Sequence, residues 1–298
     1  MRVIYGVSNI PGYRRAVLAL GVFDGVHLAH RKILAAVVKK AKAINGTSIV
    51  VTFWPHPQQQ DTIFSLEYRL REIARIGINV CIVLKFNKKL SGLSADKFIT
   101  DILLNKIHAS YIYIGRNFRF GRGAVGDFRL LYNSSRMHNF KVCVFDTIRI
   151  GSRQVSSTYI RKLIYSGKLD EAKRLLNRPV GIFGTVVRGQ SLATKLGFPT
   201  ANIDPHHEVL PPSGIYAVRV IINNKLFGGV CYIGRKKTFV NKGRRFIEVH
   251  IFDFSRNIYH RDIEVQFIKR LRGDRKFKSA QLLVAQIKKD VYLARKYS

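Results

Sequence analysis

The sequence predicts a two-domain protein in which a parallel α/β sheet domain precedes a small antiparallel β-barrel with a C-terminal helix. Three observations support this prediction. Apolar runs of strand length alternate with helical patterns up to about residue 150, strand-like runs then follow one another without helices after Pro179, and a last helical pattern closes the chain. A chain of 298 residues with 47% apolar composition can bury a core in each part. We expect the domains to be residues 1–178 and 179–298.

The first domain is predicted from five strand-like runs that alternate with helical patterns. Strands in such a succession pair in parallel, and ligands bind at their carboxyl ends. Ser65 and Ser94 stand where they would cap two of the helices, and Asp96 falls in the first turn of the second of these. The strand-like runs cover residues 16–20, 49–53, 80–84, 111–114 and 142–145, and the helical patterns cover 33–44, 66–76 and 97–104.

The junction between the first strand and the first helix carries two histidines. His27 and His30 lie in the segment GVFDGVHLAHRKIL, residues 21–34, where Gly21 and Gly25 permit sharp backbone turns. Free backbone N–H groups and the helix dipole attract phosphate oxygens at a helix N-terminus, and two imidazoles add further donors. The segment therefore predicts a phosphate-binding site, and a pair of surface histidines is the alternative.

A second helix start of this kind is predicted in the segment VSSTYIR, residues 155–161. It offers the hydroxyl groups of Ser156, Ser157 and Thr158, with Arg161 one turn further on. Hydroxyls, N–H groups and a guanidinium are suited to a phosphate or a pyrophosphate. An ordinary Ser/Thr cap beside a solvated arginine is the alternative reading.

The loop after the strand at 111–114 contains a pattern that is typical of dinucleotide binding. Gly121, Gly123 and Gly126 spell G-x-G-x-x-G, and Asp146 lies 20 residues further on. In a dinucleotide fold the first glycine follows the strand at once, whereas residues 116–120 intervene here. The sequence also lacks the P-loop pattern G-x-x-x-x-G-K-[ST]. We therefore expect any ATP to be held in another way.

The second domain is predicted from strand-like runs that follow one another without helices. Such a succession is typical of a small antiparallel barrel. The helix predicted after Ser279 carries an apolar stripe of Leu283, Ile287 and Val291, which we interpret as core packing. The strand-like runs cover residues 181–187, 215–222, 227–233, 246–254 and 263–271.

Two segments of the barrel carry side chains that suit phosphoryl chemistry. In GFPTANI, residues 197–203, Thr200 and Asn202 alternate so that both oxygens face one side, and hard oxygen ligands suit Mg²⁺ bound with a phosphate tail. In FIEVHIFDF, residues 246–254, the period of two puts Glu248 on one face with His250, Phe252 and Phe254. We expect this to be an inner face, where Glu248 would accept a proton from a substrate hydroxyl. An acidic residue on a solvent face is the alternative.

The charge, the cysteines and the apolar runs of the chain bear on its partners and its location. The formal charge of +34 would attract ATP, RNA and anionic surfaces alike, but the basic residues are spread along the chain, so we expect no specific nucleic-acid partner. Cys81, Cys143 and Cys231 are odd in number and lie in apolar runs, which predicts buried thiols rather than disulfides or a zinc site. No stretch reaches membrane-spanning length and no secretory signal is recognised, so we expect a cytoplasmic protein without a membrane partner.

Six motifs agree in order and spacing with one known family. The chain resembles the prokaryotic bifunctional riboflavin kinases and FAD synthetases (FMN adenylyltransferases). Members of that family have an N-terminal nucleotidyltransferase domain that moves AMP from ATP to FMN, and a flavokinase barrel that moves the γ-phosphoryl group of ATP to riboflavin. The resemblance therefore implies riboflavin, FMN, FAD and ATP as partners and Mg²⁺ as cofactor. The motifs are G-x-F-D-G-V-H-x-x-H at 21–30, N-F-R-F-G at 117–121, S-S-T-x-x-R at 156–161, G-F-P-T-A-N at 197–202, E-V-H-I-x-D-F at 248–254 and L-R-G-D-R-K-F at 271–277.

The resemblance also implies roles for single residues. His27 and His30 would stabilise the α-phosphate in adenylyl transfer, and Asn117 would lie at the flavin or nucleotide pocket. In the kinase half, Thr200 and Asn202 would bind Mg²⁺ATP and Glu248 would act as the base. The nucleotide would be bound by Gly21, Phe23, Asp24 and Gly25. The departing phosphates would be bound by Ser156, Ser157, Thr158 and Arg161.

The chain departs from the family pattern at several positions. Ala29 stands between the two histidines where glycine is usual, so a methyl group occupies a place where a backbone approaches the nucleotide. These departures leave open a protein that retains only one of the two activities, and the +34 charge leaves open a basic nucleic-acid-binding protein that reuses the fold. In the kinase half, Ala193 and Thr194 replace a Gly-Arg pair, Tyr232, Lys236 and His260 stand where Asn, Pro and Gly are common, and Asp274 is the acidic residue of the last motif.

Overall fold

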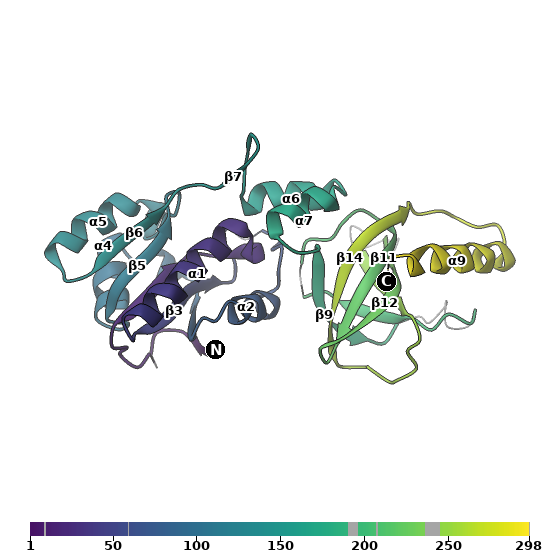
Figure 1. Ribbon diagram of the computed structural model, residues 1–298, viewed down its shortest axis with the longest axis horizontal. Coiled ribbons are helices and arrows are strands. Elements are labelled where there is room, and N and C mark those ends of the chain that lie inside the picture. Colours follow the sequence, from purple (N-terminus) through teal and green to yellow (C-terminus); the bar gives the residue numbers. More distant parts are fainter. Residues whose placement is uncertain (9, 59, 190–195, 207, 236–244, 298) are drawn as a thin grey trace. The chain divides into compact units, whose positions relative to one another are not determined.

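The structure is a computed structural model that describes the chain except for residues 9, 59, 190–195, 207, 236–244 and 298. It consists of two units, drawn in Figure 1. The first comprises Met1–Thr62 and Leu66–Ser157, and the second comprises Ile63–Ser65 and Thr158–Ser298. Most of the segment between residues 158 and 178, which the sequence-based boundary assigns to the first domain, is thus counted with the second unit. The boundary after residue 178 stays a prediction.

A six-stranded parallel sheet forms the centre of the first unit. Its strand order is β1-β4-β3-β2-β5-β6, and every described pair is parallel, as the alternation of strands and helices predicts. The edge strand β1 was not predicted, because four residues with a single buried side chain are too short to show a period. The strands are β1 (Arg2–Tyr5), β2 (Ala16–Leu20), β3 (Thr47–Trp54), β4 (Val80–Lys85), β5 (Ala109–Gly115) and β6 (Lys141–Phe145).

Helices on the two faces of this sheet explain its apolar composition. Every residue of β2 is buried, as expected for a central strand of a parallel sheet. Helix α1 buries the side chains of Ile33, Leu34 and Val37, and the turn after the Ser94 cap widens into a π-type helix that adds Phe98, Ile99 and Leu103 to the main core. The helices of this unit are α1 (Leu28–Ala43), α2 (Leu66–Arg75), α3 (Lys88–Ser91), α4 (Ala95–Lys97), η2 (Phe98–Leu104) and α5 (Phe128–Met137).

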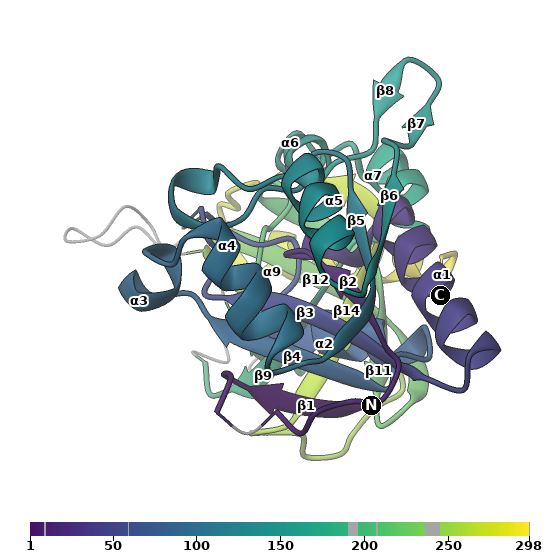
Figure 2. The same cartoon turned by 90° about the vertical axis from the view of Figure 1, so that its left-hand side faces the viewer.

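The strand order places the candidate loops at one edge of the sheet. From β2 the chain continues to β3 on one side, while β5 pairs with β2 on the other side. The loops after β2 and β5 therefore leave the carboxyl edge where the order of strands reverses, which is where open α/β sheets bind ligands. Figure 2 shows, in the same unit, a short hairpin that stands out from the sheet. The strands of this hairpin are β7 (Arg149–Ile150) and β8 (Arg153–Gln154). Elsewhere in the unit, the short helical turn η1 (Asp24–Val26) follows β2, and η3 (Arg122–Ala124) follows β5.

The second unit contains a closed antiparallel barrel with the order β10-β13-β12-β11-β14-β9. The predicted barrel is thus confirmed, and the GFPTANI segment supplies the additional strand β10. Strand β13 ends at Ile251 rather than at residue 254, because Asp253 adopts φ 54°, a left-handed conformation that a strand does not continue through. The strands are β9 (Gly181–Val187), β10 (Ala201–Asp204), β11 (Gly214–Ile222), β12 (Lys225–Arg235), β13 (Arg245–Ile251) and β14 (Asp262–Arg272).

Among the described residues, the helices that accompany the barrel are α6 (Ser157–Tyr165), α7 (Leu169–Leu176) and α9 (Ala280–Arg295). The helix predicted after Ser279 is α9, and the Ser279 hydroxyl caps it by accepting from the N–H of Leu282 at 3.3 Å. The predicted apolar stripe of α9 is half-buried, and Ala294 is the apolar residue that the helix buries fully. An ion pair of 2.7 Å between Arg272 of β14 and Asp290 holds the helix beside the barrel. None of the described helices is long and apolar enough to cross a membrane.

Candidate active sites

The two histidines of the first unit lie together at the start of α1. His27 is the cap of the helix, and its Nδ1 accepts a hydrogen bond from the backbone N–H of His30 at 3.4 Å. The two rings are stacked with centroids 3.6 Å apart, and Phe23 meets His30 edge-on at 5.2 Å. Because Nδ1 of His27 is an acceptor, the neutral ring carries its proton on Nε2. His30 Nδ1 is buried and has no hydrogen-bond partner among the described residues.

Burial keeps both rings neutral near pH 7. The His27 side chain lies away from water, which lowers its pKa to about 4. For His30 the pKa is held well below 6.5, first by burial and then by the nearby charges of His27 and Arg69. An approaching triphosphate has the opposite effect, because negative charge favours the protonated imidazole. A neutral imidazole keeps one N–H group, so each of the two rings can donate one hydrogen bond.

A buried arginine, Arg69 of α2, supports the loop that carries these histidines. Its Nη1 donates to the carbonyl oxygen of Val22 at 2.6 Å and its Nη2 to that of Phe53 at 3.1 Å, so one guanidinium joins the ends of β2 and β3. Burial lowers the pKa of Arg69, and the charge of Asp24 opposes that shift. Arg69 was not predicted from the sequence as a residue of this site. The sequence feature that could have identified Arg69 is its spacing, because helical periodicity puts it on the same face as the apolar residues Leu66 and Ile73.

The other first-unit residues named from the 21–25 motif are buried within this loop. Phe23 is in the left-handed conformation with φ 55°, and its ring packs against Gly21, where a Cβ atom would approach it to 3.1 Å. Gly25 has φ 77°, which a residue without a Cβ adopts at little cost. Asp24 is 1% exposed. These residues build a tight turn directly before the helix that carries the histidines.

The VSSTYIR segment contacts this loop through Ser157. Its hydroxyl donates to the carbonyl oxygen of Asp24 at 2.9 Å, which joins the start of α6 to the turn before α1. Ser156 is half-buried and Thr158 is exposed, while Arg161 is 7% exposed. The division between the units falls after Ser157, so Thr158 and Arg161 belong to the second unit. The structure therefore brings Ser157 to the histidine loop by a direct contact.

Asn117 lies in the loop that follows β5 at the same carboxyl edge. It is exposed, and the loop turns back through an isolated bridge between Phe120 and Gly126. Gly121 and Gly123 have φ 75° and 67° and form turns rather than the start of a long helix. Only then does the chain enter α5, so the dinucleotide pattern in this loop is not part of a strand–glycine–helix junction.

The barrel brings Asn202, Glu248 and Tyr232 into one row on neighbouring strands. Asn202 of β10 is paired with Glu248 of β13, which in turn is paired with Tyr232 of β12. Side chains of such pairs stand about 5 Å apart on the same face. The Tyr232 hydroxyl donates to Asp274 Oδ1 at 3.0 Å, and burial together with the charges of Asp274 and Glu248 raises the Tyr232 pKa to about 12. A carboxylate, an amide and a phenol thus share one surface.

This surface is the outer face of the barrel, which corrects the expectation of an inner face for Glu248. The inward positions of β13 are Ile247, Val249 and Ile251, which are buried, whereas Glu248 and His250 are half-buried. The predicted alternation of side chains along β13 is present, but the face that carries Glu248 points outward. The interior of a closed six-stranded barrel is filled by branched apolar side chains. Phe252 is buried next to Ala217 and Ala294 of α9, also outside the barrel.

Thr200 precedes β10 and is half-buried. The Asn202 side chain packs against the backbone of Gly189, and a Cβ atom on that glycine would lie 2.1 Å from the Cγ of Asn202. The ring of His250 forms a hydrogen bond of 2.8 Å with the carbonyl oxygen of Pro199, which ties the GFPTANI segment to β13. Hydroxyl and amide oxygens of this kind suit Mg²⁺ that is bound mainly by phosphates. In the described part of the chain no group of three or more His, Cys, Asp or Glu side chains is arranged as a metal cage.

The structure locates some of the departures from the expected motif pattern. Ala29 is half-buried in the first turn of α1. His260 has φ 62°, a left-handed conformation that explains why glycine suits this position. Ala193, Thr194 and Lys236 lie outside the described residues.

Comparison with known proteins divides the chain in the same order. A family model described as FAD synthetase matches residues 10–159, and one described as riboflavin kinase matches residues 176–298. Three curated relatives carry the name bifunctional riboflavin kinase/FMN adenylyltransferase. The relative from Buchnera aphidicola subsp. Schizaphis graminum is 35% identical over 100% of this chain and 99% of its own. The relative from Escherichia coli strain K12 is 33% identical over 100% and 98%, and that from Bacillus subtilis is 33% identical over 95% and 92%.

Solved structures were compared with the chain as well. A crystal structure described as that of a macrolide-efflux protein from Streptococcus pneumoniae is similar with a TM-score of 0.87, at 27% sequence identity and with full coverage of both chains. The likeness extends over both units, so the succession of sheet domain and barrel is shared by a protein of known structure.

Proposed function

The chain belongs to the family of bifunctional riboflavin kinases and FMN adenylyltransferases, and from this membership we propose how its residues divide the two reactions. The protein transfers the γ-phosphoryl group of ATP to riboflavin, which gives FMN, and transfers AMP from ATP to FMN, which gives FAD and pyrophosphate. The observation that carries this conclusion is that both family models match, in order, on one chain. We assign residues 1–178 to the adenylyltransferase domain and 179–298 to the kinase domain, which the limits of the two matches support.

In adenylyl transfer, a phosphate oxygen of FMN attacks the α-phosphorus of ATP, and the bond to the departing pyrophosphate breaks. We assign His27 and His30 to the α-phosphate, because their stacked rings lie at a helix N-terminus and His30 Nδ1 is buried without a partner among the described residues. Donors aimed at the developing negative charge lower the barrier most when they are held in place beforehand. The turn formed by Gly21, Phe23, Asp24 and Gly25 would provide that support and bind the nucleotide.

Further first-domain residues complete this assignment. The start of α6, with Ser156, Ser157, Thr158 and Arg161, is assigned to the departing pyrophosphate, and the contact of Ser157 with Asp24 supports a place beside the histidine loop. Asn117 is assigned to the flavin or nucleotide pocket, since it is exposed in the loop after β5 at the carboxyl edge.

In the kinase reaction, the 5′-hydroxyl oxygen of riboflavin attacks the γ-phosphorus of ATP, and ADP leaves. We assign Glu248 as the base that accepts the hydroxyl proton, a role worth about 10² to 10⁴ in rate. Its half-buried place on the outer barrel face, paired with Asn202, supports this role because both substrates can reach it from outside. Thr200 and Asn202 would hold Mg²⁺ together with the phosphates of ATP. When bound, the ion would neutralise charge on the phosphate oxygens.

Partners and location follow from the substrates. ATP is the co-substrate of both reactions, and riboflavin, FMN and FAD are substrates or products. We propose that the protein acts in the cytoplasm, where ATP is supplied, with no membrane partner and no specific nucleic-acid partner. The +34 charge is then a general attraction for anions rather than a recognition surface.

A reciprocal pair of variants tests the assignment of the two sites. Wild-type protein is incubated with ATP and Mg²⁺ and either riboflavin or FMN, and the flavins are separated by chromatography. Glu248→Gln is expected to lose FMN formation by about 10²-fold or more and to keep FAD formation from supplied FMN, because only the kinase base is lost. His30→Ala is expected to show the reverse. If the wild-type protein forms neither product the function is rejected, and an unchanged kinase rate in Glu248→Gln rejects the base assignment.

A further inference from the structure

Arg69 of α2 is a buried cation inside the sheet unit. It is 0% exposed, and its guanidinium carbon lies 5.7 Å from the ring centroid of Trp54 at the end of β3. Its terminal nitrogens donate to the carbonyl oxygens of Val22 and Phe53, and its Nε has no hydrogen-bond partner among the described residues. Burying a charge is costly, and apolar side chains of similar volume often replace buried charges without loss of stability. The presence of this cation therefore points to a function at the neighbouring site.

The carbonyl oxygen of Val22 is a fixed point in the chain that leads from β2 to the histidines. It accepts a hydrogen bond of 2.6 Å from Arg69 and a second one of 2.9 Å from the hydroxyl of Thr52 in β3. The preceding residue is held as well, because the N–H of Gly21 donates to the carbonyl oxygen of Val51 at 3.2 Å. The backbone is thus fixed from β3 and from α2 directly before the turn that precedes α1.

The side chain that follows this fixed point contacts the histidine pair. Phe23 is the next residue after Val22, and its left-handed backbone places its buried ring edge-on to His30, with centroids 5.2 Å apart. The ring of His30 stacks in turn on that of His27 at 3.6 Å. A movement of the Val22 carbonyl would therefore move Phe23 and alter the packing of both imidazoles.

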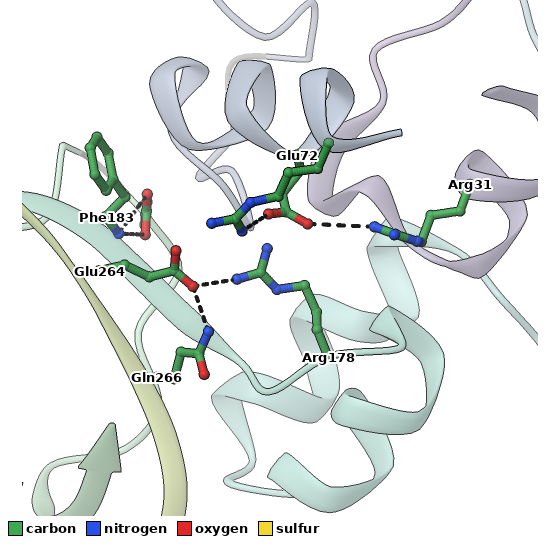
Figure 3. A network of polar contacts seen from close by, with 8 residues as sticks. Arg31, Glu72, Arg178, Phe183, Glu264 and Gln266 are labelled. Atoms are coloured by element: carbon green, nitrogen blue, oxygen red, sulfur yellow. Dashed lines mark hydrogen bonds and ion pairs between the residues drawn. The ribbon is translucent and has the colours of Figure 1, made fainter. Parts of the chain in front are cut away.

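Helix α2 is also tied to α1 within the same unit. Glu72, one turn beyond Arg69, is 3% exposed and accepts from Arg31 at 3.5 Å (Figure 3). Arg31 is the neighbour of His30 in α1, and Glu72 pairs with Arg75 as well. The face of α2 that carries Arg69 is thus held against the helix that begins at the histidines, and the guanidinium has a defined place from which to donate.

We propose that Arg69 is a positioning residue for adenylyl transfer, which fixes the Val22 carbonyl and through Phe23 holds His30 in place. The inference rests on the proposed assignment of this reaction to His27 and His30. Donors to a transition state act best when they are held in place beforehand, and a displacement of about 1 Å can reduce the rate by about 10²-fold.

Arg69→Met tests the proposal, because it keeps much of the side-chain volume and removes the charge and both donors. We expect the kcat of FAD formation from FMN to fall by about 10-fold or more, with a smaller change in the KM for ATP. The rate of FMN formation from riboflavin, measured on the same preparation, should stay within about 2-fold, since the residues assigned to the kinase lie in the other unit.

A conservative variant and a matched control accompany this substitution. Arg69→Lys keeps the positive charge and can still donate to a carbonyl oxygen, so its kcat of FAD formation should return to within about 3-fold of the wild-type value. Arg136→Met makes the same change at an exposed arginine of α5 in the same unit, and it should alter neither activity.

A second substitution at the Val22 carbonyl separates positioning from stability. Thr52→Val removes the other donor and keeps the shape of the side chain. In the wild-type background Arg69 still holds the carbonyl, so the loss of kcat should be smaller than in the Arg69→Lys background, where one ammonium replaces the fork to two oxygens. Unfolding in urea, followed by the fluorescence of Trp54, shows that the sheet unit of each variant is folded under the assay conditions.

The proposal is overturned if folded Arg69→Met forms FAD with the wild-type kcat, if both activities fall together, or if Arg69→Lys is as impaired as Arg69→Met. An equal effect of Thr52→Val in the two backgrounds would overturn it as well, and this comparison decides alone if Arg69→Met does not fold. Absence of FAD formation in the wild-type protein would instead reject the assigned function.

Discussion

Replacing His27 by asparagine should change how the stability of the first unit depends on pH. The folded pKa of His27, about 4, lies below the value of about 6.5 for an unfolded chain. As pH falls, the unfolded chain therefore binds the proton before the folded chain does. The stability that uncharged His27 contributes is fully present above about pH 6.5 and is lost between about pH 6.5 and about pH 4. The resulting loss at about pH 5, relative to about pH 7.5, is about 2 kcal/mol of the free energy of unfolding.

Asparagine is the suitable replacement because it keeps a helix-capping oxygen at the position of His27 while it removes the titrating ring. Urea unfolding at about pH 7.5 and about pH 5 can be followed by the fluorescence of Trp54 at the end of β3, since the chain has a single tryptophan. We expect the wild-type protein to lose about 2 kcal/mol more than His27→Asn over this interval. Parallel losses in the two proteins would refute the burial of an uncharged His27.

Three further predictions concern the barrel and the metal. His260→Gly should raise the free energy of unfolding of the barrel unit by about 0.5 to 1 kcal/mol, because φ 62° strains a residue with a Cβ; a lower midpoint in urea would contradict this. Tyr232→Phe removes the hydrogen bond to Asp274 and should lower stability by about 0.5 to 1.5 kcal/mol, and an unchanged melting temperature would show that the bond contributes nothing. Chelation of Mg²⁺ should abolish both activities, with recovery on adding the ion back; either activity persisting without a divalent ion would rule out the assigned cofactor.

Periodicity predicted most of the fold because both kinds of sheet leave clear patterns in this chain. The five strand-like runs of the first unit and the strands β9, β11 and β14 appear within a few residues of their predicted places. Short elements escaped prediction: β1 has four residues, and β7 and β8 have two each. Their pairing is decided by neighbours that are distant in sequence, which a local pattern does not contain.

In the candidate sites, too, features set by local sequence were predicted and features set by the folded chain were not. The histidine pair was predicted at a helix N-terminus because glycine turns, a strand and a helix bracket it locally. The direction of Glu248 was predicted wrongly, since a period of two gives alternation but does not say which face a closed barrel fills. Arg69 was not predicted. Its guanidinium donates to carbonyl oxygens of two segments that are distant in sequence, and only the folded chain brings these together.

The two transfer reactions can be distinguished by following which phosphate of ATP enters each flavin. Riboflavin is supplied with ATP labelled either at the γ-phosphate or at the α-phosphate, and the labelled flavins are separated. We expect γ-label in both FMN and FAD, and α-label in FAD alone, since one reaction transfers the terminal phosphoryl group and the other transfers AMP. Flavins without either label, with folded protein and Mg²⁺ present, would contradict it.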